Sequence, residues 1–444
     1  MFLKRKEILT VLFITLLLMA LTYVFALLEN FSLYYYIITP LIIFLISFKK
    51  EYIIILYLIL LPTAGIIPSQ ENILEAFGLD EIINLIAIAY FVSFKRVKIK
   101  LNNKQKNVKS LLILVIIIIL LYNFKNAYFN IYDGSFFLAF KRFIFITINY
   151  LPLFLIIQHI SNFKIRQYVI LGLYISSGII VFSQLFNEYL LALNFVTFND
   201  SEIVGLAANI DKVSRFSGFY NGDPNSSGIF LLMIIGFIFT QIEKFSQQRK
   251  ILYALVLFFC MGILLTASRT VFVSFAVILL FFIYNNRASK FSIQLYFLFF
   301  LGIIFSLDFI LNQLSRFHDA HLQTSTEVDG NRIMKWVYYI KFMMASPSYF
   351  ITGSQEVINI RSAHNVYVQM LFNVGIFPLI LFIVKLIKSF TLLIKHNKRA
   401  IYFILPFFCI TMFVGELKEV PIYILLFILI ISEPKSKKIL KTQG

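Results

Sequence analysis

Long apolar stretches separated by short polar segments recur along nearly the whole chain. A helix needs about 17–25 mostly apolar residues to cross the hydrocarbon core of a bilayer, and the pattern predicts about 14 such helices. They are expected, to within a few residues, at 8–27, 33–48, 52–68, 79–95, 109–124, 138–158, 167–187, 226–242, 250–267, 270–285, 291–310, 366–388, 400–415 and 419–433. Most stretches are apolar on every face, so periodicity does not show which faces pack together. The predicted fold class is all-α, a polytopic membrane protein.

The composition agrees with this pattern and removes several classes of function. Of the 444 residues, 60% are hydrophobic and 14% are charged, whereas soluble domains carry about 25% charged residues. A soluble enzyme, a disordered chain and a secreted disulfide scaffold are therefore excluded. Cys260 and Cys409 both lie inside apolar stretches, so the sequence predicts neither a disulfide nor a cysteine-ligated metal.

The distribution of Lys and Arg predicts the orientation of the chain, whose net charge is +18. If both termini are cytoplasmic, 28 of the 40 basic residues fall in cytoplasmic segments, as the positive-inside rule requires. This basic excess would face anionic lipids, and nucleic acid is not an expected partner. Lys4, Arg5 and Lys6 precede the first stretch, which we interpret as a retained anchor rather than a signal peptide.

Two long polar segments on the opposite side define the expected organisation. It consists of N-terminal transmembrane helices (1–187), a first large outer loop (188–225), central transmembrane helices (226–310), a second large outer loop (311–365), and C-terminal transmembrane helices with a basic cytoplasmic tail (366–444). Loops of this length are usually functional. We therefore expect the chemistry on the outer side.

Arginines gather near the outer membrane boundary. Arg215 precedes a Gly-Asp-Pro-Asn segment that ends at Asn225, and Arg269 lies in a very short turn between two apolar stretches. Arg332 and Arg361 lie in the second outer loop. A single arginine at a helix end usually reaches lipid headgroups. Several guanidinium groups together would instead bind the oxygens of a diphosphate.

His364 is the second candidate for chemistry. The next helix is predicted to start near Asn365, which places His364 at or beside a helix N-cap at the outer boundary. A neutral histidine can take a proton from an alcohol as general base, and nearby Arg361 and the positive helix end favour that neutral form. The alternative is a capping histidine without a chemical role.

Other polar groups in the outer loops are weaker candidates. The spacing of His318 and His321 is compatible with a divalent metal, but a solvated loop is the simpler interpretation. Glu416 or Glu419 could orient His364, although both also fit a solvated turn. The sequence predicts no metal and no other cofactor.

In these segments the chain resembles the O-antigen ligase and O-antigen polymerase superfamily of bacterial membrane glycosyltransferases. The resemblance covers about residues 205–380. It rests on four segments in the family's order: Arg215 three residues before Gly218 and leading to Pro224-Asn225, then Ser268-Arg269-Thr270, then Arg332, then His364-Asn365 followed by Gly375.

The resemblance implies a GT-C-type fold and a metal-independent enzyme of the bacterial inner membrane, with its active site facing the periplasm. The donor would be an undecaprenyl-diphosphate-linked oligosaccharide, and a polysaccharide chain-length regulator would be a partner. Arg215 and Arg269 would bind the donor diphosphate, and His364 would activate the acceptor hydroxyl. Ligases usually carry an acidic residue where this chain has Asn373, which favours the polymerase branch.

The expected function is therefore O-antigen polymerase in lipopolysaccharide biosynthesis. The first alternative is O-antigen ligase, which transfers the polymer to lipid A core. A lipid-linked glycan flippase is a further alternative, but a flippase needs charged groups along a central cavity, and most span interiors here lack basic residues. A channel is disfavoured because polar residues do not recur within the spans.

Overall fold

The structure is a computed structural model of the chain. It describes residues 49–61, 79–93, 103–129, 136–185, 224–242, 248–266, 268–285, 332–354, 365–413 and 420–432, besides the isolated Phe13 and Leu17. Within these ranges all regular structure is helical, and no strand occurs.

The described ranges form the following helices, in chain order. They are α3 (Tyr52–Leu60), α4 (Leu79–Ser93), α5 (Asn103–Phe129), α6 (Phe136–His159), α7 (Phe163–Leu185), α10 (Pro224–Gln241), α11 (Arg249–Leu265), α12 (Arg269–Asn285), α15 (Arg332–Ala345), α16 (Pro347–Thr352), α17 (Val366–Val374), α18 (Ile376–His396), the 3₁₀ turn η4 (Lys398–Ala400), α19 (Ile401–Phe413) and α20 (Val420–Ile431).

The apolar stretches predicted most of these helices. By length and composition, three described stretches can cross a membrane, at Gln105–Tyr122, Phe163–Leu185 and Ile376–His396. Four shorter apolar helices lie in α4, α10, α12 and α20. The described part of the chain is all-helical, and the length and apolar composition of these helices indicate membrane association. The stretches expected at 33–48 and 291–310 lie outside the described residues, as does nearly all of 8–27.

The stretch expected as one helix at 366–388 is instead a helical hairpin, which corrects the prediction. Its bend is Gly375, at φ +86° and ψ −175°, a conformation that is essentially restricted to glycine. The rings of Tyr367 in α17 and Phe382 in α18 lie 6.2 Å apart. In one straight helix these two residues would be about 22 Å apart. Both halves are apolar, so hydrophobicity alone did not reveal the bend.

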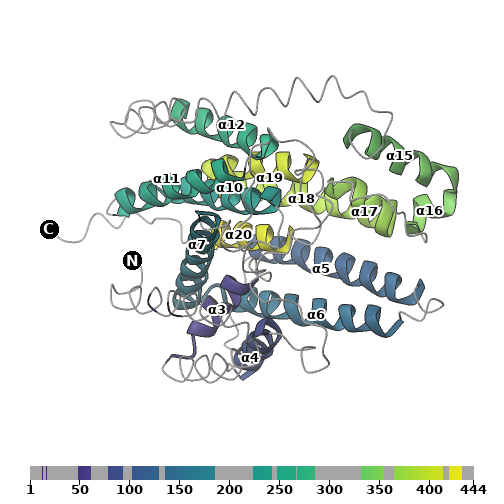
Figure 1. Cartoon of the computed structure of the whole chain (residues 1–444), viewed down its shortest axis with the longest axis horizontal. Helices are drawn as coiled ribbons and strands as arrows, with labels where there is room; N and C mark the ends of the chain where they lie inside the picture. The colour runs from purple at the N-terminus through teal and green to yellow at the C-terminus, as the bar shows by residue number, and fades with distance from the viewer. Residues whose placement is uncertain are drawn as a thin grey trace.

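Two further helices, α15 and α16, lie within the segment 311–365 that was expected to be a loop. The ring of Tyr339 in α15 packs edge-on against Phe372 in α17, with centroids 4.9 Å apart. We call α15, α16 and α17 the cap. Figure 1 shows the cap at the right-hand end of the molecule, beyond the ends of α10 and α12.

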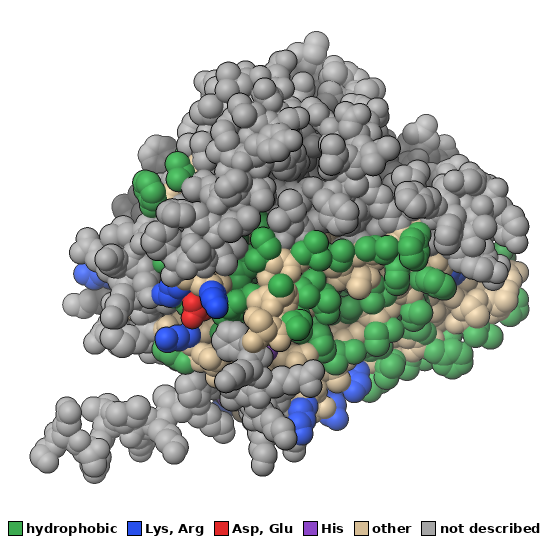
Figure 2. All heavy atoms as spheres, turned by 90° about the horizontal axis from the view of Figure 1, so that it is seen from below, with side chains coloured by type: hydrophobic (Ala, Val, Ile, Leu, Met, Phe, Trp, Pro, Cys, Tyr) green, Lys and Arg blue, Asp and Glu red, His purple; other side chains and the backbone are tan. Residues whose placement is uncertain are grey.

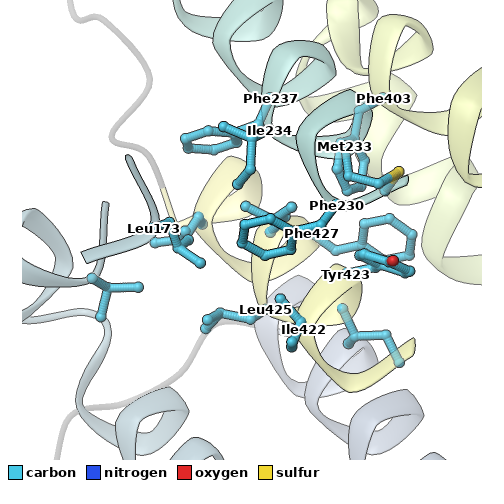
Figure 3. Close-up of a cluster of buried hydrophobic side chains, with 14 of the residues drawn as sticks. Leu173, Phe230, Met233, Ile234, Phe237, Phe403, Ile422, Tyr423, Leu425 and Phe427 are labelled. Atoms are coloured by element: carbon cyan, nitrogen blue, oxygen red, sulfur yellow. The ribbon is translucent and has the colours of Figure 1, made fainter. Parts of the chain in front are cut away.

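The helices α10 and α20 form the centre of the remaining structure, which we call the body. Every described side chain from Ser226 to Gln241 and from Val420 to Ile431 is buried. Figure 3 shows side chains of the two helices in one apolar cluster, with Phe230 of α10 near Tyr423 and Phe427 of α20. Large apolar side chains therefore fill the body.

Apolar side chains also cover much of the outside. Phe377, Val384 and Ile387 of α18 are each more than half exposed, as is Leu280 of α12. Figure 2 shows one broad hydrophobic face, with Lys and Arg side chains toward its left and lower margins. Soluble monomers rarely expose apolar patches of this extent, and a surface of this kind fits contact with lipid.

Candidate functional site

The helices α10 and α12 run parallel and begin side by side. A Cβ placed on Gly228 of α10 would lie 3.1 Å from the side chain of Val271 in α12. Farther along, the rings of Phe239 and Phe282 stack with centroids 4.1 Å apart. Eleven residues separate the two contact points in each helix. The helices are therefore in step along their length.

This alignment brings two of the predicted site residues to one place. Arg269 is the first residue of α12, two residues before Val271, and so it lies level with Ser226, two residues before Gly228. Asn225, which precedes Ser226, lies half-buried in the first turn of α10. The backbones at Asn225 and Arg269 are thus neighbours, although 44 positions separate them in the sequence.

Buried hydrogen bonds fix the turn that leads into α12. The Thr266 hydroxyl donates to the Ile263 carbonyl at 2.7 Å and accepts from the Ser268 N–H at 3.3 Å. The Gln184 side chain at the end of α7 donates to the Ser227 hydroxyl in α10 at 3.3 Å. These contacts hold the first turns of α10 and α12 against α7 and the end of α11.

A third helix start, that of α17, is fixed by Asn365. Its side-chain oxygen accepts from the N–H groups of Tyr367 and Val368, both at 3.0 Å, so Asn365 is the N-cap. Its amide nitrogen donates to the Met412 carbonyl at the end of α19, at 2.9 Å. The prediction that this helix begins near Asn365 is confirmed, and His364 directly precedes the cap in the sequence.

The helix α19 sets the level of this third start. A Cβ on Gly236 of α10 would lie 3.3 Å from the Cα of Phe403 in α19, and Phe239 packs against Tyr402, so α10 and α19 are antiparallel. Gly228 lies eight residues before Gly236 in α10, and Thr411 lies eight residues after Phe403 in α19. Equal rise per residue places these two at the same level.

The Tyr367 hydroxyl is hydrogen-bonded to the Thr411 hydroxyl at 3.0 Å, which brings the first turn of α17 to that level too. Because α17 folds back on α18 and α18 is followed by the antiparallel α19, α17 runs parallel to α19. It therefore points opposite to α10 and α12. The N-terminal ends of α10 and α12 face one zone from the body, and that of α17 faces it from the cap (Figure 1).

Three helix N-termini that face one zone favour an anion between them. Each N-terminus carries N–H groups without an intrahelical partner and a partial positive charge of about half a unit. Phosphate groups commonly occupy such positions. The Asn365 side chain satisfies two of these N–H groups in α17, and α10 begins with Pro224, which has no N–H. What the three helix starts share is therefore the positive end of the helix dipole.

The structure accounts for the predicted site residues unequally. It places the backbones of Arg269 and Arg332 at the first positions of α12 and α15, whereas their side chains lie outside its description. Arg215, Arg361 and His364 lie outside the described residues altogether. The same applies to the metal candidates His318 and His321. Elsewhere in the described ranges, no three His, Cys, Asp or Glu side chains come together.

The sequence interpretation missed two residues at the far end of α17. Lys125 at the end of α5 contacts the last turn of α17, and Gly353 after α16 packs against the same turn. The signal in the sequence is faint, because an isolated lysine after an apolar stretch is also what a membrane boundary produces.

Comparison with known proteins adds no family to this site. No family model, no curated protein and no solved structure matches the chain. The resemblance to O-antigen ligases and polymerases therefore rests on the motifs quoted above.

Proposed function

We propose that the chain is a membrane glycosyltransferase of the O-antigen polymerase type. It takes a glycan from undecaprenyl diphosphate and transfers it to a hydroxyl of another lipid-linked repeat unit. The reaction takes place at the periplasmic face of the inner membrane, at the zone between the starts of α10, α12 and α17. The observation that carries the proposal is the convergence of these three helix N-termini.

The chemistry of the reaction fits such a zone. The periplasm holds no nucleotide-sugar pool, so the donor arrives already activated on lipid. Breaking its sugar–phosphate bond leaves a lipid diphosphate, whose growing negative charge needs stabilisation. Arg269 and Arg215 supply a guanidinium fork for this charge, and the positive ends of the α10 and α12 dipoles stabilise it further.

The acceptor needs a base on the other side of the same zone. A sugar hydroxyl is a poor nucleophile at neutral pH, and a base within about 2.6–3.2 Å must take its proton as it attacks. His364 directly precedes the cap of α17, the helix whose start faces α10 and α12. In this arrangement the diphosphate binds at the helix starts of the body, and the base comes from the residue that precedes α17 of the cap.

The first test uses Arg269→Lys in purified protein with lipid-linked repeat units. Lysine keeps the charge but lacks the fork, so polymer formation should fall by at least about tenfold. The matched control is Arg249→Lys, because Arg249 starts α11 as Arg269 starts α12 but lies at the opposite end of the bundle. Equal activity of both variants would contradict a diphosphate clamp at α12.

The second test uses His364→Gln, which keeps a hydrogen-bond acceptor but cannot take the proton. Base catalysis contributes about 10²–10⁴-fold, so transfer should slow by that factor while donor affinity is retained. His396→Gln at the end of α18 is the control. Wild-type turnover of His364→Gln would show that this histidine only adjoins a cap.

Lipopolysaccharide banding in a deletion strain separates the polymerase from the ligase. Core carrying a single repeat unit supports the polymerase. Bare core with lipid-linked polymer accumulating supports the ligase, which transfers to lipid A core.

A further inference from the structure

The ammonium group of Lys125 lies at the C-terminal ends of two helices of the cap. Its Nζ donates to the Asn373 carbonyl in the last turn of α17 at 3.2 Å and to the Thr352 carbonyl at the end of α16 at 3.5 Å. Lys125 follows the apolar stretch Gln105–Tyr122 of α5 and is half-buried. The last carbonyls of a helix lack intrahelical partners and carry partial negative charge, so they favour a cation.

These two helix ends are packed closely by a pair of glycines. Gly353 and Gly375 follow α16 and α17 and have φ of +82° and +86°. A Cβ on Gly353 would lie 2.6 Å from the Asn373 carbonyl, and a Cβ on Gly375 would collide with the Ile351 carbonyl. The absence of a Cβ at both glycines therefore allows these two helix ends to lie in contact. Lys125 is the cation that the structure places on both.

The opposite end of α17 is the end that faces the proposed reaction zone. The helix has nine residues and is therefore about 13 Å long. Its first turn is held by Asn365 on Met412, and its last turn by Lys125. A short rigid helix held at both ends transmits a displacement at one end to the other.

Resting on the proposed function, we propose that Lys125 is a positioning residue. By binding the C-terminal carbonyls of α16 and α17, it holds the α17–α18 hairpin so that the start of α17, the helix that His364 precedes in the sequence, faces α10 and α12. Lys125 itself touches neither substrate nor the reacting atoms.

Hydrogen–deuterium exchange of the full-length protein in lipid nanodiscs tests the clamp without reference to activity. Lys125→Met keeps the apolar stem of the side chain, which ends one atom short, and removes the charge and the donors. Amides of residues 366–374 should then exchange at least about tenfold faster. Lys125→Arg should restore most of the protection. The matched control is Lys341→Met, because Lys341 is an exposed lysine of the cap that should leave the exchange of α17 unchanged.

Transfer kinetics separate positioning from substrate binding. A displacement of about 1 Å can lower a rate by about 10²-fold, so Lys125→Met should lose turnover while its KM for the lipid-linked donor stays within about twofold. Lys125→Ala should regain turnover with millimolar n-propylammonium, which replaces the missing ammonium group and its three methylene carbons. A raised KM with unchanged turnover would instead make Lys125 a substrate ligand and overturn the proposal.

The two arms distinguish failure of the proposal from failure of the proposed function. Wild-type exchange of α17 in Lys125→Met overturns the clamp, whatever the activity. Faster exchange of α17 in that variant, together with a wild-type protein that transfers no glycan, keeps the clamp and overturns the glycosyltransferase.

Discussion

The body and the cap are held together by different physical means. In the body, aromatic rings pack together, such as those of Phe407 and Phe427, whose centroids lie 5.1 Å apart. The helix α20 is buried along its described length. In the cap, α17 also packs through Phe372, but hydrogen bonds hold both of its ends, through the amide of Asn365 and the ammonium of Lys125. The body is therefore held by many similar apolar contacts, whereas the ends of α17 in the cap depend in addition on a few directional hydrogen bonds.

The difference teaches where function is sensitive to change. Apolar packing in a bilayer is distributed over many atoms, because lipid competes for every apolar surface and no single contact dominates. Hydrogen bonds are directional, so losing one changes where a helix lies. Substitutions in the body should change stability with little effect on turnover, and substitutions in the cap should do the reverse.

Among the changes that compare the cap with the body, Gly375→Ala should have the largest effect. Alanine at φ +86° costs about 1–3 kcal/mol in backbone strain, and its Cβ would also collide with the Ile351 carbonyl. The hairpin should open, and transfer should fall by about 10²-fold. Gly178→Ala in α7 is the control, because the nearest atom to its new Cβ, on Phe258, lies 4.0 Å away. Comparable activity of the two variants would show that the bend is dispensable.

Phe427→Ala should lower stability and leave turnover unchanged, the reverse of what is expected for Gly375→Ala. Truncation of a core phenylalanine costs about 3–5 kcal/mol in soluble proteins. Lipid is as apolar as the body, so only the packing share is lost, and we expect about 2 kcal/mol. Thermal unfolding in detergent should occur at a lower temperature, while turnover per folded molecule is retained. A loss of turnover without a loss of stability would remove the distinction between body and cap.

Asn365→Ala should lower both the transfer activity and the stability, each by a moderate amount. Loss of an N-cap costs about 1 kcal/mol, and the bond to the Met412 carbonyl is lost with it. We expect turnover per folded molecule to fall in addition to this loss of stability, because His364 adjoins this cap. Asn397→Ala removes a similar cap, that of η4, where Asn397 accepts from the Arg399 N–H at 3.1 Å. Equal loss of transfer in both variants would argue against a special role for the start of α17.

The smallest effect is expected from pH. Burial lowers the pKa of Lys125 from its ordinary value, so its ammonium loses the proton at a lower pH than a solvated lysine. The clamp is complete below this pKa and weakens as the pH rises through it, because the neutral amine keeps donors but no charge. Transfer should therefore decline on the alkaline side.

Lys125→Arg should move that decline to higher pH, since a guanidinium stays protonated throughout. The measurement is the transfer rate between neutral pH and about pH 10 for the two proteins. Lys341→Arg serves as the control, because Lys341 is exposed. If transfer declined at the same alkaline pH in Lys125→Arg and in the wild-type protein, the charge of residue 125 would have no role in the clamp.

The sequence predicted most of the body correctly. The helices α6 and α7 fall within a few residues of the stretches expected at 138–158 and 167–187, and α5 contains the stretch expected at 109–124 but extends beyond it at both ends. These stretches are recognisable because the length of an apolar run can be read from the sequence alone. It also located the start of α17, since an asparagine before an apolar run is a local capping signal. The roles of Arg215, Arg269 and His364 stay predictions.

Only the tertiary structure decided how these pieces meet. The fold-back at Gly375 and the clamp at Lys125 join residues far apart in the chain, and no local pattern encodes such contacts. Asn225 and Arg269 became neighbours because Gly228 lets α10 approach α12 closely, a fact that depends on both helices at once. Local periodicity and capping are properties of one segment, whereas the convergence of helix ends is a property of packing between segments.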